Sequence, residues 1–240
     1  MRADVPMTLM ELAGGDCFVE VRRESEEHQL AHGCGLHNAG APQMQLVAAL
    51  ARAAGVKRAL DLGSGLGYST LWIASAVAEG GSVVGIDDDS SHTARATEIA
   101  AGRRGGARVE YVTGAVREVL PSLEGPFDMI HDDVWFAKTP DHLGAMLALL
   151  RPGGLLTMAN WFLLVDAITG EPRNDWKSFA GPTWAEDTFE YAHLLAARPD
   201  LHVTWVTTPP IAFATTSQSL DAATQDGWRP EVVDVDRLTS

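Results

Sequence analysis

The sequence predicts an α/β fold in which a doubly wound, mostly parallel sheet of seven strands ends in an antiparallel hairpin. From residue 42 to residue 158, short apolar runs alternate with segments whose apolar residues recur at helical spacing. Such alternation is typical of right-handed βαβ units around a parallel sheet that is covered on both faces. Two β-rich runs follow between residues 202 and 215, and so short a connection lets them pair only antiparallel.

The ends of these elements have their own sequence signals. Pro42 suits the first turn of a helix that continues to Ala54, and Gly55 suits its end. Pro152-Gly153-Gly154 separates the fifth helix from the fifth strand. The expected strands are Arg58–Leu62, Ser82–Ile86, Arg108–Thr113, Phe127–His131, Leu155–Met158, His202–Thr207 and Ile211–Thr215. The expected helices are Pro42–Ala54, Ser69–Ala78, Ser91–Arg103, Val116–Leu123, His142–Leu150 and Asp187–Ala197.

Length and composition favour a single domain. The chain has 240 residues, of which 46% are hydrophobic and 21% charged, and this is enough for a full core without disulfides or a structural metal. No repeat or low-complexity linker divides the chain. We expect residues 1–218 to form one domain with an N-terminal helical segment over 1–41, and residues 219–240 to form an acidic tail outside the core.

Net charge and cysteine content limit which classes of partner the protein can bind and which cell compartment suits it. Asp and Glu number 32 against 18 Lys and Arg, a formal charge of −14, and such a surface repels phosphate backbones and anionic lipid. Cys17 and Cys34 cannot make a disulfide scaffold, which fits a reducing compartment. The sequence therefore predicts a cytoplasmic protein that acts on a small molecule, with no nucleic acid and no membrane as partner.

A glycine-rich loop follows the first expected strand, with the sequence Asp61-Leu62-Gly63-Ser64-Gly65-Leu66-Gly67-Tyr68-Ser69-Thr70. Glycines there let the backbone turn sharply and approach a ligand beside the free amides of a helix start. Dinucleotide sites prefer G-x-G-x-x-G, whereas this loop reads G-x-G-x-G after an acidic residue. A carboxylate at Asp61 is unfavourable beside a pyrophosphate but useful beside an amino group and a sulfonium. The loop therefore favours S-adenosylmethionine over NAD, and a tight turn without any ligand is the structural alternative.

An acidic residue ends the second expected strand. Asp87 follows Val83-Val84-Gly85-Ile86 directly, and a carboxylate at this place can accept both hydroxyls of a ribose. Asp88 and Asp89 come next, and either could instead be a solvated charge at a helix start. We expect Asp87 to bind the ribose, with Asp88 as a further candidate.

Further segments carry a resemblance to a known family. They are Gln43, Asp61–Ser69, Gly85-Ile86-Asp87, Gly114–Pro121, Phe127–Ile130, Leu149–Gly154 and Asn160. In this order, within residues 38–218, they resemble the small class I S-adenosylmethionine-dependent O-methyltransferases of the catechol and caffeoyl-CoA type. The resemblance implies a Rossmann-like fold, S-adenosylmethionine as cofactor, a small-molecule acceptor and a homodimer.

The resemblance also implies which residues contact the cofactor. They are Asp61, Gly63, Ser64, Gly65, Ser69, Asp87, Asp88, Gly114, Ala115, Val116, Asp133 and Trp135. Asp61, Gly63 and Ser69 would hold the methionine part, and Gly114, Ala115 and Val116 would line the adenine. Trp135 would pack on the adenine ring, although a large aromatic side chain there could also be a core anchor.

At two positions the chain departs from the family pattern. Typical members bind a divalent cation through two aspartates and an asparagine, and they use a lysine as the base. Asp133 and Asn160 match two ligands, but Ala159 stands in place of the second aspartate and Phe136 in place of the lysine. A hard cation depends on carboxylate ligands, so we expect no metal at this site. Asp132 is a poor substitute because its side chain should point away from that of Asp133.

Without the cation and the lysine, another group must deprotonate the acceptor. His37 immediately precedes Asn38-Ala39-Gly40, which aligns with the segment of the family that lies near the substrate. We therefore expect His37 or Asp133 to be the catalytic base, and a solvated loop histidine is the alternative for His37.

The same N-terminal segment holds a group of metal-binding residue types. His28 and His32 could share one helix face and bind Zn²⁺ with Cys34 or His37. The spacing matches no standard zinc module, and Gly33 and Gly35 should end the helix, so no metal is predicted here.

Aromatic residues crowd the chain after the fifth strand: Trp161, Phe162, Trp176, Phe179, Trp184, Phe189 and Tyr191. Because ligands of open α/β sheets lie beyond the carboxyl ends of the strands, Trp161 predicts an aromatic wall over the acceptor pocket. For Phe189 and Tyr191, ordinary core packing is the better interpretation.

The predicted function is therefore methyl transfer from S-adenosylmethionine to an oxygen of a small, partly aromatic or apolar metabolite, without a divalent metal. A family member repurposed for a cofactor-bound cyclisation or rearrangement is one alternative, and an NAD-dependent oxidoreductase is another. The apolar residues within Met7–Val21 should pack against the domain or a partner subunit.

Overall fold

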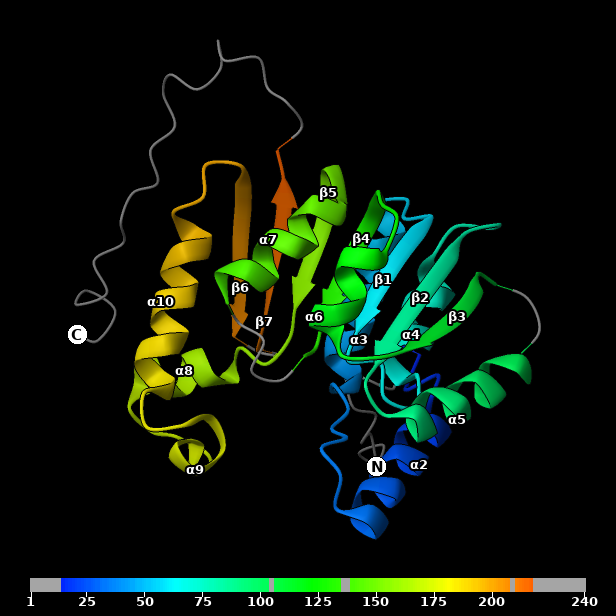
Figure 1. Ribbon diagram of the computed structural model, residues 1–240, viewed down its shortest axis with the longest axis horizontal. Coiled ribbons are helices and arrows are strands. Elements are labelled where there is room, and N and C mark those ends of the chain that lie inside the picture. Colours follow the sequence, from blue (N-terminus) through cyan, green and yellow to red (C-terminus); the bar gives the residue numbers. More distant parts are fainter. Residues whose placement is uncertain (1–13, 104–105, 135–138, 208–209, 218–240) are drawn as a thin grey trace, which may run out of the picture.

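The computed structural model describes residues 14–103, 106–134, 139–207 and 210–217. Seven strands form one sheet in the order β3-β2-β1-β4-β5-β7-β6 (Figure 1). The strands are β1 (Arg58–Leu62), β2 (Ser82–Asp87), β3 (Arg108–Thr113), β4 (Phe127–Asp132), β5 (Leu150–Met158), β6 (Leu201–Thr207) and β7 (Pro210–Thr216). β1 to β5 pair in parallel, and β7 is antiparallel to both β5 and β6. The predicted doubly wound sheet with its antiparallel hairpin is confirmed.

Successive residues of each central strand alternate between two apolar cores, as the pleat requires. Ala59 and Met129 belong to the core under α3 (Ala41–Ala53) and α4 (Tyr68–Ala76). Leu60 and Ile130 belong to the core under α6 (Val116–Val119), α7 (Pro140–Leu149) and α10 (Trp184–Ala196). Both faces of the sheet are thereby covered, which explains why the strand sequences read as nearly continuous apolar runs.

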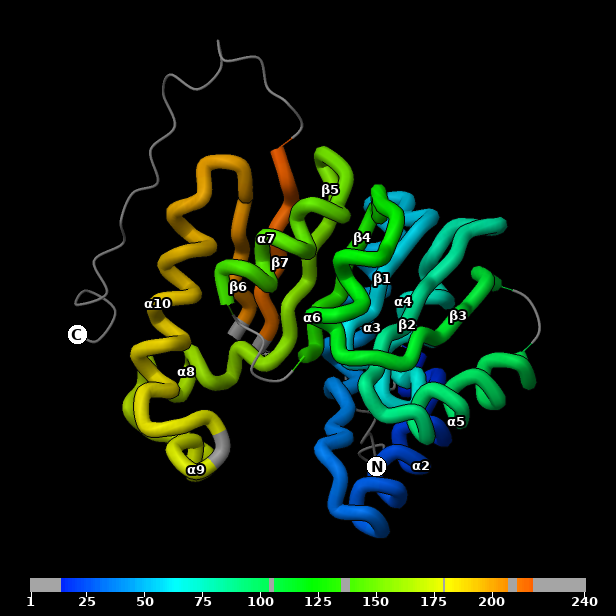
Figure 2. Tube along the Cα trace, in the orientation of Figure 1, coloured from blue at the N-terminus to red at the C-terminus, as the bar shows by residue number. Residues whose placement is uncertain are grey.

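The remaining helices lie toward the carboxyl ends of the parallel strands, and one of them, α5, also packs on β2 and β3 (Figure 1). α2 (Val19–His32) packs beside α5 (Ser90–Ala101), and α8 (Phe162–Thr169) and α9 (Trp176–Ala180) follow β5 (Figure 2). All but α5 lie beyond the carboxyl ends of the parallel strands, where the glycine-rich loop also emerges (Figure 1). α2 is fixed there by Phe18, whose ring meets Trp72 of α4 edge-on with 5.3 Å between centroids.

The structure differs from the predicted elements in three places. The helix expected over Val116–Leu123 ends at Val119 and continues as a 3-10 turn over Leu120–Ser122, because Pro121 has no N–H to donate. β5 begins at Leu150, eight residues before its end, through the Pro152-Gly153-Gly154 segment that was expected to precede it. α8 and α9 were not predicted as helices.

The predicted domain boundary and tail fall on residues outside the described ranges. The boundary at 218 and the tail over 219–240 lie outside the described residues, as do residues 1–13 of the N-terminal segment. Among the described helices, none combines the length and the apolar composition that a membrane crossing requires.

Asp128 at the start of β4 joins three strands at the amino-terminal edge of the sheet. Its Oδ2 accepts the backbone N–H groups of Lys57 and Arg58 at 2.9 and 2.8 Å, and its Oδ1 accepts Nε of Arg151 at 2.6 Å. Partial burial acts to raise the pKa of Asp128, but these hydrogen bonds and the Arg151 charge outweigh it and hold the pKa below its usual value.

We predict that Asp128→Ala lowers the free energy of unfolding by about 2 kcal/mol near neutral pH, because three donors lose a charged acceptor. Since the folded-state pKa is depressed, this stabilisation is present above the usual carboxyl pKa and disappears as the pH falls through the folded value. Urea unfolding at several pH values measures both effects, with Glu79→Ala, an exposed loop acid, as the matched control. A gap between Asp128→Ala and the parent chain that does not narrow in acid would contradict the assignment.

Candidate active site

The glycine-rich loop between β1 and α4 has backbone φ angles that residues with a Cβ rarely adopt. Gly63, Gly65 and Gly67 have φ of 83°, 51° and 91°, in the left-handed region. A Cβ on Gly63 would lie 2.9 Å from the carbonyl oxygen of Asp133, and one on Gly65 would overlap Leu36. The loop is thus pressed between the end of β4 and the segment that follows α2.

Asp61, at the start of this loop, is fully buried beneath it. Its Oδ2 accepts the hydroxyls of Ser69 and Thr70 at 2.8 and 2.5 Å, which ties the end of β1 to the first turn of α4. Its Oδ1 is buried and has no hydrogen-bond partner among the described residues. Burial raises the pKa of Asp61, although the charge of His131 and both hydroxyls act in the opposite direction. The unpartnered oxygen is suited to a cationic donor.

Asp87 ends β2 and holds the other side of the loop. Its Oδ2 accepts the N–H of Gly65 at 2.8 Å, and its Oδ1 accepts the N–H of Asp89 at 3.1 Å and lies 3.0 Å from Nδ1 of His92. The neighbouring Asp89 caps α5 by accepting the N–H groups of Ser91 and His92, so it has the helix-start role that was considered for it. Asp88 is exposed.

A cavity of about 980 Å³, here called the loop cavity, opens beside these residues. Of the residues predicted to bind the cofactor, its lining includes Gly63, Gly65, Asp87, Asp88, Ala115, Val116 and Asp133. Asp61, Ser64 and Ser69 are buried next to it but do not line it, and neither does Gly114. Trp135 and Phe136 lie outside the described residues. The structure therefore brings most of the predicted cofactor residues to one cavity.

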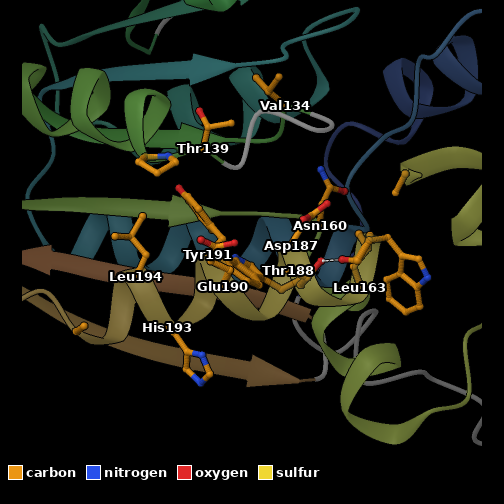
Figure 3. Close-up of a pocket in the computed structure, with 15 residues that line it drawn as sticks. Val134, Thr139, Asn160, Leu163, Asp187, Thr188, Glu190, Tyr191, His193 and Leu194 are labelled. Carbon is orange, nitrogen blue, oxygen red and sulfur yellow. Dashed lines mark hydrogen bonds between the residues drawn. The ribbon is translucent and has the colours of Figure 1, made fainter. Parts of the chain in front are cut away.

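A second cavity of about 690 Å³, the aromatic cavity, lies between α7, α8 and α10. Figure 3 shows Val134 and Thr139 on one wall and Tyr191 and Leu194 of α10 on the other. Trp161, at the end of β5, stacks on Tyr191 with 5.9 Å between ring centroids. Of the aromatic residues named in the sequence, Trp161, Trp184 and Tyr191 line this cavity.

Some aromatic residues take other roles than predicted. Tyr191 is 3% exposed and lies in the core, as expected, and it also lines the aromatic cavity beside Trp161. Trp176 is buried outside the lining, and its Nε1 donates to Asp166 at 2.7 Å. Phe189 is half-buried and does not line the cavity. Trp184, one of the predicted aromatic residues, lines the cavity as well, and so does Thr139, which the sequence did not indicate.

The two cavities meet at Val134 and Thr139, which line both. Asp133 lines the loop cavity, Asn160 lines the aromatic cavity, and Nδ2 of Asn160 donates to Oδ1 of Asp133 at 3.0 Å. Asn160 has φ of 65°, a left-handed conformation that Asn tolerates better than most residues. This pair therefore stands at the junction of the cavities.

The residues at the junction do not fit the divalent-cation site that the family resemblance implies. Ala159 offers no ligand atom, and Asp132 is buried with Oδ1 3.2 Å from Nε2 of His142, on the other side of the strand. Asp132 does point away from Asp133, as predicted. Of the two ligand types that the resemblance implies, Asp133 and Asn160 are present, and the Asn160 amide already donates to the Asp133 carboxylate.

His37, the other predicted base, lines the rim of the loop cavity. Its side chain is exposed, and its ring nitrogens lie 3.0 and 3.2 Å from Nε2 of Gln29. Gln29 therefore positions the ring on the α2 side of the cavity.

The N-terminal histidines form a different group from the one considered in the sequence. His28 and His32 do share a face of α2, with 4.4 Å between ring centroids, and Gly33 ends the helix as expected. The third side chain that meets His28 and Cys34 is His92 of α5, however, and not His32 or His37. Sequence spacing missed His92 because 58 positions separate it from Cys34 and only the docking of α2 on α5 brings them together.

Comparison with known proteins agrees with this geometry. A family model described as "Methyltransferase domain" matches residues 60–161. A catechol O-methyltransferase of Niastella koreensis is 34% identical over 121 residues, which cover 49% of this chain and 53% of that protein. The chain spans about half the length of the curated relatives it matches.

Solved structures share the fold over more of the chain. A putative O-methyltransferase from Klebsiella pneumoniae has a TM-score of 0.65 and 26% identity, over 82% of this chain and 90% of that one. An O-methyltransferase from Bacillus cereus, solved with S-adenosylhomocysteine, has a TM-score of 0.68 and 21% identity, over 87% and 97%. The chain thus has the fold of the Rossmann-like O-methyltransferases, part of it is similar in sequence to a catechol O-methyltransferase, and its residues 60–161 match the methyltransferase-domain model.

Proposed function

We propose that this protein transfers a methyl group from S-adenosylmethionine to an oxygen of a small, partly aromatic or apolar metabolite. The observation that carries the proposal is the junction of two cavities at Asp133, Val134, Thr139 and Asn160. A group-transfer enzyme must hold donor and acceptor side by side in one reactive geometry, and two adjoining cavities supply that arrangement. The methyltransferase relatives favour this function over cyclisation and over an NAD-dependent oxidoreductase.

The loop cavity suits the cofactor. Asp87 lines it, and its Oδ2, which accepts one N–H from Gly65, has room to accept a ribose hydroxyl as well. Ala115 and Val116 provide an apolar wall for the adenine. The buried, unpartnered Oδ1 of Asp61 supports a positively charged amino group near the loop. The structure from Bacillus cereus with S-adenosylhomocysteine supports the same class of ligand.

The aromatic cavity suits the acceptor. Trp161, Trp184 and Leu194 present apolar surface that would pack against a flat ring. The hydroxyl of Tyr191 is buried, lines this cavity and has no hydrogen-bond partner among the described residues. Burial and the negative charge of Asp132 raise the pKa of Tyr191, so the hydroxyl stays protonated and can donate to an acceptor oxygen. An acceptor with both a ring and oxygen substituents meets these requirements.

The chain's own residues then serve the reaction by alignment and proton removal. S-adenosylmethionine would supply a methyl group bound to a sulfonium sulfur. The acceptor oxygen would bond to the methyl carbon in line with the carbon–sulfur bond, and the sulfur would leave as that bond breaks. Asp133 lines the loop cavity and accepts a hydrogen bond from Asn160, which lines the aromatic cavity, so it is our first candidate to receive the acceptor proton. His37 reaches the loop cavity from the rim and is the second candidate.

We further propose that the protein is a cytoplasmic homodimer and that residues 1–218 act as one domain. Both cysteines are free thiols, which suits a reducing compartment. Leu30 on α2 is 85% exposed, and we place it in the proposed subunit contact.

We predict that light scattering gives the mass of a dimer, because α2 presents Leu30 to a second copy of the chain. Leu30→Asp should shift the population toward the monomer, whereas Ile168→Asp, at a site that is 59% exposed on α8, should not. A monomer mass for the unmodified chain at all concentrations would contradict the proposed dimer.

The cofactor assignment predicts that calorimetry detects binding of S-adenosylhomocysteine and not of NADH. Asp87→Ala should weaken this binding roughly 10- to 100-fold, since each charge-assisted hydrogen bond contributes about 1.5–3 kcal/mol. Glu171→Ala, an exposed acid far along the chain, is the control and should bind normally. NADH binding as tight as that of S-adenosylhomocysteine would refute the assignment.

Turnover should not depend on Mg²⁺, because Asp133 and Asn160 alone make a poor site for a hard cation. The assay is a mass-spectrometric screen of phenolic metabolites with isotope-labelled cofactor, run before and after exhaustive EDTA treatment. Asp133→Ala should reduce turnover more than His37→Ala if Asp133 is the base, and the reverse order would assign His37. Activity that EDTA abolishes and Mg²⁺ alone restores would return Asp133 and Asn160 to the role of metal ligands.

A further inference from the structure

Three metal-binding side chains meet at the edge of the loop cavity. They are His28 on α2, Cys34 in the segment that follows it and His92 in the first turn of α5. One ligand atom from each lies within 4.8 Å of the other two, and no other group of three His, Cys, Asp or Glu in the described part of the chain meets this condition. Figure 2 shows α2 and α5 side by side at this edge.

His92 has the features of a prepared ligand. Its side chain is 7% exposed, and its Nδ1 lies 3.0 Å from the Asp87 carboxylate, an acceptor for a proton on Nδ1 in the tautomer whose Nε2 lone pair faces a metal. Nε2 is buried and has no hydrogen-bond partner among the described residues, since the nearest carboxylate oxygen, on Asp89, is 3.7 Å away. A carboxylate that orients a histidine in this way is the usual support of a zinc ligand.

The packing of α2 delivers the other two ligands. Glu24 accepts Nε and Nη2 of Arg95 at 2.5 and 3.1 Å, which docks α2 along α5 and places the His28 ring 5.1 Å from that of His92. Gly33 then ends α2 in the left-handed conformation, with φ of 62°, and the chain turns back to present Cys34. Three segments are thus held in place without the ion.

We propose that His28, Cys34 and His92 bind Zn²⁺. Two imidazole nitrogens and one thiolate are the ligands that this ion prefers, whereas Mg²⁺ requires oxygen. A tetrahedral zinc with bonds of about 2.0–2.3 Å keeps its ligand atoms roughly 3.3–3.8 Å apart, so small rotations of the half-buried His28 and Cys34 close the site. The fourth position is left for water or for His32, which adjoins His28.

The ion would control the entrance of the loop cavity, and this part of the inference rests on the proposed function. Cys34, Leu36 and His37 all line that cavity, and Leu36 lies against Gly65. By fixing Cys34 to α5, the ion would hold this segment over the glycine loop. It would also act on Asp87, the proposed ribose ligand, through the hydrogen bond from His92.

The test uses the full chain stripped of metal and titrated with Zn²⁺ in a calorimeter, and in parallel with Co²⁺ in a spectrophotometer. We expect one ion per chain and, with Co²⁺, a near-ultraviolet absorption band from thiolate-to-metal charge transfer. Cys34→Ser should abolish that band, and both Cys34→Ser and His92→Gln should weaken Zn²⁺ binding about 100-fold or more. Cys17→Ser and His202→Gln, which change an exposed cysteine and an exposed histidine, should behave as the parent chain.

Circular dichroism and thermal unfolding without metal check that each variant is folded, and Cys34→Ser keeps the test valid where His92→Gln fails to fold. Failure of the parent chain to bind Zn²⁺, or equal loss of binding in Cys17→Ser and Cys34→Ser, would overturn the proposal. The titration needs neither cofactor nor acceptor, so its failure is separate from that of the methyltransferase function. Failure of the zinc-loaded chain to bind S-adenosylhomocysteine would instead count against the proposed function.

Discussion

The close approach of three chain segments at the end of β1 is the constraint on which the site depends. The loop after Leu62 passes beneath the Asp133 carbonyl and beside Leu36, and it does so without room for a Cβ at Gly63 or Gly65. Backbone N–H groups of Gly63 and Ser64 donate to the Ile86 carbonyl, so the same turn is fastened to β2. The positions of Asp87, Asp133 and the segment after α2 are therefore set by one turn, and each of them lines the loop cavity.

Two buried carboxylates show how the chain satisfies one charge and leaves another incomplete. Asp166 lies far from the turn: burial acts to raise its pKa, but hydrogen bonds from Arg173 and Trp176 and the Arg173 charge lower it overall, so this carboxylate is fully used in joining α8 to α9. Asp61 has the opposite balance, since burial dominates and one oxygen is left without a partner among the described residues. Buried polar atoms of this second kind cost stability in the free protein. Their concentration beside the loop and the aromatic cavity is consistent with sites that are completed by ligands.

Sequence reasoning succeeded where one local pattern determines the outcome. β1 and β3 begin and end at the predicted residues, and the turn at Gly63 follows from the glycines themselves. Features that depend on contacts between distant segments were not predictable in this way. The meeting of Cys34 with His92 requires α2 to dock on α5, and the aromatic lining at Tyr191 requires α10 to pack on α8 and β6. α8 and α9 escaped prediction because Gly170 and the polar residues after it interrupt the apolar periodicity.

The antiparallel hairpin has a consequence for how the chain folds. β7 lies between β5 and β6 and hydrogen-bonds to both, although it follows both in sequence. During synthesis β5 and β6 are made first, and each then has an edge whose N–H and C=O groups await residues 210–216. An open edge of this kind is a template for pairing with another chain, so the nascent protein is exposed to aggregation until its last described strand is inserted. The last strand, β7, is therefore inserted between two strands that already exist rather than added to an edge of the sheet. Its pairing is a late step that joins distant parts of the sequence.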